Sequence, residues 1–199
     1  MQEVKVKLQL VTEMLGTAPK NKEVYETYID TKRPDGGKDE IDIEAVEERG
    51  WTGIRSDEKG LFIFDYMVKG FLKHWGNVKK DAPGFKVKAL RSKIDDVVFI
   101  NPRKVYLYKD GILIKEPTGV VERPLTAMTM KGPRTSLARS DKVDEGTTLE
   151  FTITLIDTGK NEITVDKIRA LLDYGNLSGL GQFRNGGYGR FKVVEFAEV

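Results

Sequence analysis

One segment near the C-terminus, residues 177–191, restricts the fold more than any other stretch of the sequence. It contains five glycines, interleaved with aromatic and basic residues: Gly179, Gly181, Gly186, Gly187 and Gly189. Glycine lacks a Cβ atom, so such a run can adopt positive φ angles and lets another backbone or a phosphate approach closely. The segment separates a helical pattern from a strand pattern at residues 191–199. We therefore expect a tight helix-to-strand connection, which either serves packing alone or faces a ligand.

The composition describes a folded chain with few options for metal or redox chemistry. Its 199 residues are 39% hydrophobic and 32% charged, which is enough to bury a core. The chain has no cysteine, which excludes disulfides and thiolate metal sites, and one histidine, His74, which argues against a histidine-based metal centre. Carboxylate-bound Mg²⁺ stays open, but we expect no cofactor. The sequence shows no bilayer-length apolar run and no signal-peptide core, so we expect a cytoplasmic protein without a membrane partner.

The net charge is only +2, but the charges are unevenly distributed along the chain. Residues 34–48 hold seven acids against one base, whereas residues 79–93 hold six bases against one acid. Residues 123–142 hold five bases against one acid, and the glycine-rich segment is basic as well. Each such run is most often a solvated face. If the three basic segments gather on one surface, that surface would attract a polyanion.

Hydrophobic periodicity predicts a mixture of strands and helices. Residues 3–11 alternate, so Val4, Val6, Leu8 and Leu10 should face the core. Further strands are expected at residues 61–64, 97–100, 104–108, 112–114 and 147–156, with a turn at Asp110 and Gly111. Helical spacing marks residues 66–80, with Asp65 as N-cap and Val78 on the apolar side, and residues 163–174, which Gly175 should terminate.

The remaining stretches are predicted as connections and insertions. Residues 14–19 should form a turn, followed by two short helices at residues 22–30 and 40–49. Residues 120–130 predict a strand broken at Pro124, and residues 131–142 a basic, hydroxyl-rich loop.

The order of these elements indicates an α+β fold with a ferredoxin-like or RRM-like βαββαβ core. The core would carry large insertions, at residues 17–57 and a β-rich one at residues 94–142, and would end in the glycine-rich loop. We find no internal repeat and no low-complexity linker, so residues 1–199 are expected to form a single domain.

Three segments, in this order, resemble motifs of the RAMP superfamily, the RRM-like proteins that form the backbone of class 1 CRISPR effector complexes. Residues 61–73, LFIFDYMVKGFLK, are similar to the strand and helix start I-P-G-S-S-L-K-G-x-x-R. Residues 144–153, DEGTTLEFTI, resemble P-x-G-T-x-F-x-F-x-I, and residues 179–191 resemble the glycine-rich loop G-G-x-x-x-x-G-x-G-R. Residues 14–17 and 172–175 are similar to stand-alone proteins of phages that infect Gram-positive bacteria.

Together, the resemblance and the basic segments imply a non-catalytic protein that binds single-stranded DNA or RNA, alone or as a homo-oligomer along the strand. Where the motif has Gly-Ser-Ser, this chain has Asp65, Tyr66 and Met67, so that phosphate contact is not expected here. The residues expected to bind the strand are Lys69, Lys86, Lys88, Arg91, Arg134, Arg139, Gly179, Gly181, Phe183, Arg184, Gly187, Tyr188 and Arg190.

Two other functions stay open. A phage-borne interaction protein could use the acidic residues 35–48 to occupy the nucleic-acid channel of a host or phage protein partner, for instance in host defence. A metal-independent endoribonuclease, similar to the CRISPR RNA-processing branch of the superfamily, would use His74 as general base. In the target-cleaving backbone subunits of the same superfamily, a loop aspartate takes part in cleavage of the strand. By position, the corresponding residue of this chain would be Asp30, Asp35 or Asp39.

Overall fold

The computed structural model describes residues 1–20, 51–129, 132–159 and 162–199. The two helices predicted at residues 22–30 and 40–49, the acidic segment and its aspartates lie outside these ranges. Among the described residues, no helix combines the length and the apolar character that crossing a membrane requires.

The larger of two sheets confirms most of the predicted strands. Its order is β13 (Phe191–Glu198), β1 (Gln2–Leu10), β12 (Thr148–Leu155), β8 (Lys104–Lys109), β6 (Leu61–Phe64) and β5 (Arg55–Ser56). In addition β7 (Val98–Asn101) pairs with β12, and β9 (Ile112–Leu113) pairs with β8. Neighbouring strands are antiparallel throughout this sheet. The alternation of β1 has the predicted result, because Val4, Val6, Leu8 and Leu10 are all buried.

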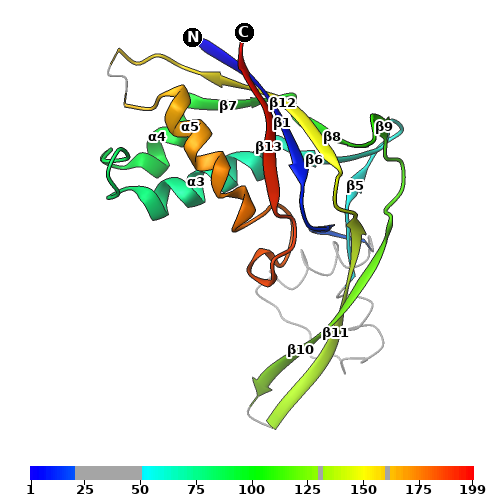
Figure 1. The fold of residues 1–199 in the computed structure, drawn as a ribbon. Coiled ribbons are helices and arrows are strands. Elements are labelled where there is room, and N and C mark those ends of the chain that lie inside the picture. The colour runs from blue at the N-terminus through cyan, green and yellow to red at the C-terminus, as the bar shows by residue number, and fades with distance from the viewer. Residues whose placement is uncertain (21–50, 130–131, 160–161) are drawn as a thin grey trace, which may run out of the picture.

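Three helices cover one face of this sheet: α3 (Asp65–Lys79), α4 (Leu90–Val97) and α5 (Val165–Leu172) (Figure 1). The predicted helix at residues 66–80 is confirmed, but its N-cap is Phe64, so the prediction of Asp65 as N-cap is wrong. Val78 is exposed instead of buried, because the helix turns Gly76 toward α4. A Cβ at Gly76 would lie only 2.6 Å from Ile94 Cδ1. Sequence periodicity missed α4, which is short and half of whose residues are charged: Arg91, Lys93, Asp95 and Asp96.

The arrangement of these elements is a mixed α+β fold. Along the chain, β1, α3, β7, β12, α5 and β13 follow one another, with other elements between them. In space, β13 neighbours β1, β1 neighbours β12, and β12 neighbours β7. The buried cluster between sheet and helices draws on β1, β12, α3 and α5. The domain limits and insertions proposed from the sequence remain predictions.

The second sheet is built around a long two-stranded arm that extends away from the body (Figure 1). Its strands, β10 (Gly119–Thr129) and β11 (Gly132–Val143), pair from Gly119↔Lys142 to Thr129↔Gly132. The predicted loop at residues 131–142 is therefore wrong for the described part of that range. The predicted break at Pro124 is also wrong: β10 is an edge strand, where a residue without an N–H is tolerated.

At its base the arm is joined by three two-residue strands. β2 (Met14–Leu15) and β4 (Thr52–Gly53) both pair with β11, and β3 (Ala18–Pro19) pairs with β4. The turn predicted at residues 14–19 is thus replaced by short strands that attach the arm to the end of β1.

Gly175 does not end the last helix as predicted. After α5 the chain continues into a 3-10 turn, η1 (Asp173–Asn176), in which Gly175 is buried. A Cβ at this position would overlap the ring of Phe191, which is itself buried and packs with its centroid 4.9 Å from that of Phe71. Glycine is needed here because the first residue of β13 fills the space.

We predict that Gly175→Ala destabilises the protein by about 1–3 kcal/mol, because the added methyl displaces a core ring. Gly70→Ala is the matched control. Gly70 lies inside α3 with no atom within 4 Å of a Cβ, so this change should stabilise by about 0.5–1 kcal/mol. Urea unfolding of both variants measures the difference. Equal stability of the two variants would contradict this account of Gly175.

Asp57 fixes the turn between β5 and β6. Its carboxylate accepts hydrogen bonds from Lys104 Nζ (2.6 Å), Tyr106 Oη (2.9 Å) and the backbone N–H groups of Lys59 and Gly60. The bond from Lys104 is the main reason that the pKa of Asp57 lies far below its ordinary value of 3.8. The ionised carboxylate therefore stabilises the fold at pH values above 3.8, the ordinary pKa of the group. This stabilisation is lost as the pH falls from there toward the lower pKa of the folded state.

We predict that wild type is more stable than Asp57→Asn at neutral pH, and that the margin narrows as the pH falls below 3.8. Urea unfolding at a series of pH values measures it. Glu58→Gln removes an exposed carboxylate from the same turn and should produce a much smaller margin. A margin for Asp57→Asn that stays constant with pH would refute the assignment.

Candidate functional site

The glycine-rich loop closes on itself through backbone contacts. A Cβ on Gly179 would overlap the backbone of Gly189, and a Cβ on Gly189 would overlap the carbonyl of Leu180. Leu180 N–H donates to Gly189 O at 2.9 Å, and the side chain of Leu180 is buried. Gly189 also has a φ of +70°, which favours glycine. These glycines are therefore required by the loop's own packing.

The closed loop is also bound to the connection between β1 and β2. Gly189 N–H donates to Glu13 O at 2.8 Å, and Gln182 N–H donates to Leu15 O at 3.2 Å. Thr12 Oγ1 donates to Gly187 O and accepts from the Arg190 N–H, each at 2.9 Å. The base of the loop is thus fixed, and residues 183–188 form its tip.

The tip presents two aromatic rings and a cation. Phe183 has a φ of +54° and is 45% exposed, and Arg184 beside it is exposed. The rings of Phe183 and the half-buried Tyr188 lie with centroids 5.9 Å apart. Aromatic faces next to a guanidinium group are the combination that binds unpaired bases and phosphates.

The loop contacts the base of the arm through Gln182. Its Oε1 atom lies 2.7 Å from Thr52 Oγ1, 2.9 Å from Ser140 Oγ and 3.4 Å from an Nη atom of Arg123. The Arg123 guanidinium carbon lies 4.5 Å from the centroid of the Phe183 ring. Strands β4, β10 and β11 and the loop therefore meet at one point.

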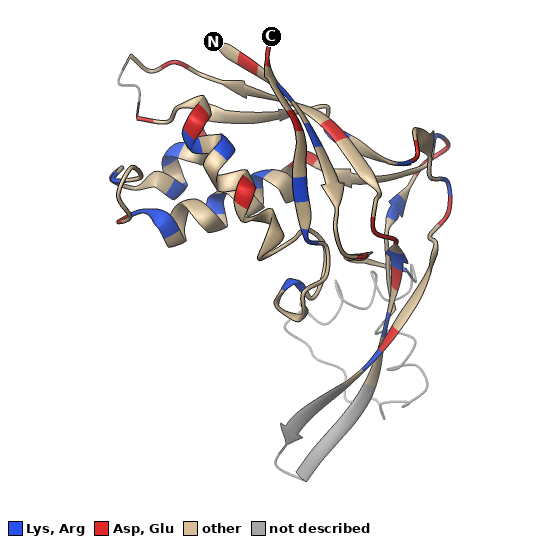
Figure 2. Ribbon diagram, in the orientation of Figure 1, with Lys and Arg blue, Asp and Glu red and all other residues tan. Residues whose placement is uncertain are grey.

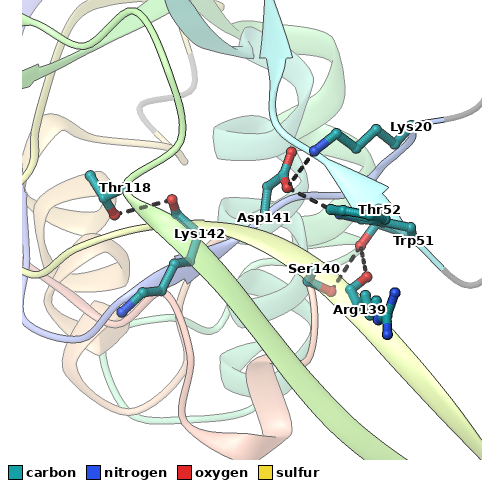
Figure 3. Close-up of polar contacts among 8 residues, drawn as sticks. All are labelled: Lys20, Trp51, Thr52, Thr118, Arg139, Ser140, Asp141 and Lys142. Atoms are coloured by element: carbon teal, nitrogen blue, oxygen red, sulfur yellow. Dashed lines mark hydrogen bonds and ion pairs between the residues drawn. The ribbon is translucent and has the colours of Figure 1, made fainter.

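On the neighbouring side of β11, Asp141 binds the two residues that flank the undescribed range 21–50 (Figure 3). Asp141 is 3% exposed, and its Oδ1 accepts from Lys20 Nζ and Trp51 Nε1, each at 3.0 Å. Lys20 Nζ also lies 4.1 Å from the centroid of the Trp51 ring. One buried carboxylate thus attaches the residues on both sides of this range to β11 of the arm.

The predicted strand-binding residues fall into two groups (Figure 2). The first comprises the loop and Arg139, which lies on the arm and pairs with Glu122 at 2.8 Å. Arg134 lies on β11 opposite Ala127, with its side chain outside the described part of the structure. The second group lies on and between α3 and α4: Lys69, Lys86, Lys88 and Arg91. The structure therefore divides the predicted residues between the loop and arm on one side and the helices on the other.

Lys69, His74 and Arg91 line a surface cavity of about 350 Å³ between α3 and α4. Asp95 neutralises part of its charge, because it lies 2.6 Å from Lys73 Nζ and 3.5 Å from Lys69 Nζ. The bond from Lys73 is the main reason that the pKa of Asp95 is lowered.

Among the described residues, His74 forms no hydrogen bond or ion pair with the acidic and basic side chains that line this cavity. Tyr66 also lines it, but it precedes His74 by eight residues on α3, which corresponds to about 12 Å along the axis. That separation is too large for concerted proton transfer. In the described ranges, no three side chains of the His, Cys, Asp or Glu type cluster as metal ligands.

The loop and arm retain cations without acidic partners. Among the described residues, Arg123, Arg184 and Arg190 form no ion pair. In addition, the Nε atoms of Arg123 and Arg190 are buried without a hydrogen-bond acceptor. Buried donors are normally paired, and the described residues supply no acceptor for these two. By contrast, Lys142 is paired with Glu13 (2.7 Å) and Asp144 (3.1 Å), which raise its pKa.

Sequence reasoning missed four residues of this junction: Thr52, Arg123, Ser140 and Gln182. Arg123 belongs to one of the basic segments of the sequence, but no motif marks it as a site residue. The other three are ordinary polar residues far apart in sequence, and only the pairing of β4 with β11 brings them together. No local pattern could have identified them.

Comparisons with known proteins support the fold. No protein-family model and no curated protein matches the sequence. Among solved structures, the fold is similar to a chain of "Cryo-EM structure of the Type III-B Cmr-beta bound to cognate target RNA", with a TM-score of 0.54 and 13% sequence identity. The match covers 100% of the present chain and 60% of that chain. At this identity the likeness concerns the fold alone.

We predict that Asp141→Ala loosens the arm base and costs about 1–3 kcal/mol, chiefly because Trp51 Nε1 loses its acceptor. Lys20 is about half exposed and can be rehydrated, so it contributes less. The chain has two tryptophans, so a Trp75→Phe background lets Trp51 fluorescence report urea unfolding. Asp141→Asn keeps an acceptor and is the matched control. An equal loss in both variants would contradict the role of the Trp51 bond.

Proposed function

We propose that this protein binds single-stranded nucleic acid, without cleaving it, between the tip of the glycine-rich loop and the base of the arm. The observation that carries the proposal is the group of arginines without an acidic partner among the described residues, Arg123, Arg184 and Arg190, of which Arg184 is exposed at the loop tip. A phosphate oxygen is the acceptor that guanidinium groups bind most effectively. These arginines lie beside the aromatic tip, where bases can stack.

The topology supports a ferredoxin-like core of the RAMP type. The neighbour order β13, β1, β12, β7, with α3 and α5 as the connecting helices, corresponds to a βαββαβ unit. The similar solved structure is of a Type III-B Cmr-beta complex bound to cognate target RNA. We extend nucleic-acid binding, but no catalytic step, to the present chain, and propose the cytoplasm as its location.

Binding would combine stacking with charge. The rings of Phe183 and Tyr188 offer faces that suit any base, so sequence preference should be weak. Arg123 lies over Phe183 at 4.5 Å and can contribute to both the ring contact and a phosphate contact. Neighbouring copies of the protein along the strand are the natural way to cover a longer strand.

We predict that Arg184→Ala weakens binding and reduces the slope of log K against log salt by about 1, as expected for one lost phosphate contact. Fluorescence anisotropy with labelled single-stranded DNA and RNA at several salt concentrations measures both quantities. Lys86→Ala is the matched control, because it removes one exposed cation from the α3–α4 connection.

Three outcomes would overturn the proposal. They are no binding of either strand at micromolar protein, an equal effect of Arg184→Ala and Lys86→Ala, and shortening of the labelled strand in a gel that disappears in His74→Ala. The last outcome would make the protein an endoribonuclease.

A further inference from the structure

A second aromatic and basic surface lies outside the glycine loop. We call it the aromatic strip, and it consists of Phe62, Phe64, Tyr66 and Tyr106. Along β6 and β8, the residues that alternate with these are buried in the core, among them Ile63, Val105 and Leu107. Successive side chains of a strand point to opposite faces. Phe62, Phe64 and Tyr106 therefore lie on the face of the larger sheet that the helices leave uncovered.

The rings of the strip form a continuous series. Tyr106 and Phe62 lie with centroids 5.9 Å apart, and Phe62 and Phe64 lie 5.2 Å apart in an edge-on arrangement. Phe64 and Tyr66 are stacked, with centroids 5.2 Å apart and an interplanar angle of 24°. From Phe62 onward burial falls: Phe62 is 4% exposed, Phe64 is half-buried and Tyr66 is 54% exposed. Tyr66 is therefore an open end of the stack.

Two guanidinium groups lie beside Phe64, the ring that stacks on Tyr66. The guanidinium carbons of Arg55 and Arg103 lie 5.4 Å and 5.5 Å from the centroid of the Phe64 ring. Both side chains belong to exposed residues, and among the described residues neither forms an ion pair with a carboxylate. Lys104 differs, because Asp57 neutralises it at 2.6 Å. The two free guanidinium groups of the strip thus lie beside Phe64, and the Nζ atom of Lys59 lies 5.9 Å from the centroid of the Tyr106 ring.

Tyr66 also connects the two groups of basic residues. It lines the α3–α4 cavity together with Lys69, His74 and Arg91. On its other side it lines a small cavity that also includes Leu15, which pairs with Gln182 of the glycine loop. A strand leaving the loop toward α4 would pass over Tyr66.

We propose that Tyr66, Arg55 and Arg103 form a second contact site for a single strand, in which an unpaired base stacks on Tyr66 and adjacent phosphates bind the two guanidinium groups. The inference rests on the proposed function for the identity of the ligand, but it uses other residues. An acidic peptide would satisfy the arginines alone, whereas the open ring stack requires a planar partner.

The test uses the full chain and labelled single-stranded DNA and RNA in fluorescence anisotropy. Tyr66→Ala should weaken binding by about 5- to 150-fold, the range for loss of one stacked base. Tyr66→Phe keeps the ring and should bind like wild type. Arg103→Ala should weaken binding and reduce the salt slope by about 1, whereas Arg103→Lys should keep the slope. Thermal unfolding of each variant confirms that it is folded.

A second readout does not depend on affinity. Strands that carry 5-bromouracil are irradiated in complex with wild-type protein, and the cross-linked peptides are identified by mass spectrometry. We expect a cross-link to Tyr66. A complete absence of this cross-link, together with wild-type affinity of Tyr66→Ala, would overturn the proposal. Effects confined to RNA or to DNA would identify the natural strand.

The binding measurements distinguish failure of this inference from failure of the proposed function. If Tyr66→Ala binds normally while Arg184→Ala does not, the strip is no binding site and the loop is one. If the reverse holds, the strip binds the strand and the loop does not. If wild type binds neither strand but retains an acidic peptide such as polyglutamate through Arg55 and Arg103, both proposals fail. Absence of all binding overturns both as well.

Discussion

The structure around the candidate interface depends on the close approach of two backbone segments, at Gly179 and Gly189. Any side chain at either position would overlap the opposite backbone. This contact closes the loop, and the closed loop can then donate hydrogen bonds to the carbonyl groups of Glu13 and Leu15 beyond the end of β1. Because β2 also pairs with β11, the same contact determines where the arm leaves the body. Loop, arm and sheet are therefore positioned together, and disturbing one should displace the others.

Whether a lysine or arginine can bind an external anion depends on its ion pairs within the protein more than on the number of basic residues. Lys142, Lys69 and Lys73 all contact carboxylates, and the pKa shifts of Lys142 and Asp95 follow from those contacts. Their charge is largely neutralised within the protein. Arg184 and Arg190 lie in a segment that has no acid of its own, so no local partner competes with a phosphate. A modest net charge of +2 is thus compatible with a locally strong anion site.

The sequence predicts those elements whose side chains alternate or repeat against the core. β1, β12 and α3 are examples, because burial of one face imposes a clear period on each. It failed for β11, because the residues that this strand buries at the base of the arm include polar ones, Ser140 and Asp141. Burial of polar residues leaves no hydrophobic period in the sequence. It also failed for the Gln182 junction, which exists only through pairing of β4 with β11. Prediction was therefore good for the core and poor for the arm and its junction with the glycine-rich loop.

Under the proposed function, Asp65 would determine which part of a strand can approach α3. The N-terminus of a helix ordinarily attracts phosphate through its free amides and its dipole. Here a carboxylate occupies the first turn, and its Oδ1 atom is buried without a hydrogen-bond partner among the described residues. A phosphate at this helix end would meet like charge. The neighbouring side chain, Tyr66, is an exposed ring, and the free guanidinium groups of Arg55 and Arg103 lie beside the ring of Phe64, the N-cap residue. Under the proposed function, the start of α3 would favour a base over the ring of Tyr66, with the adjacent phosphates at Arg55 and Arg103.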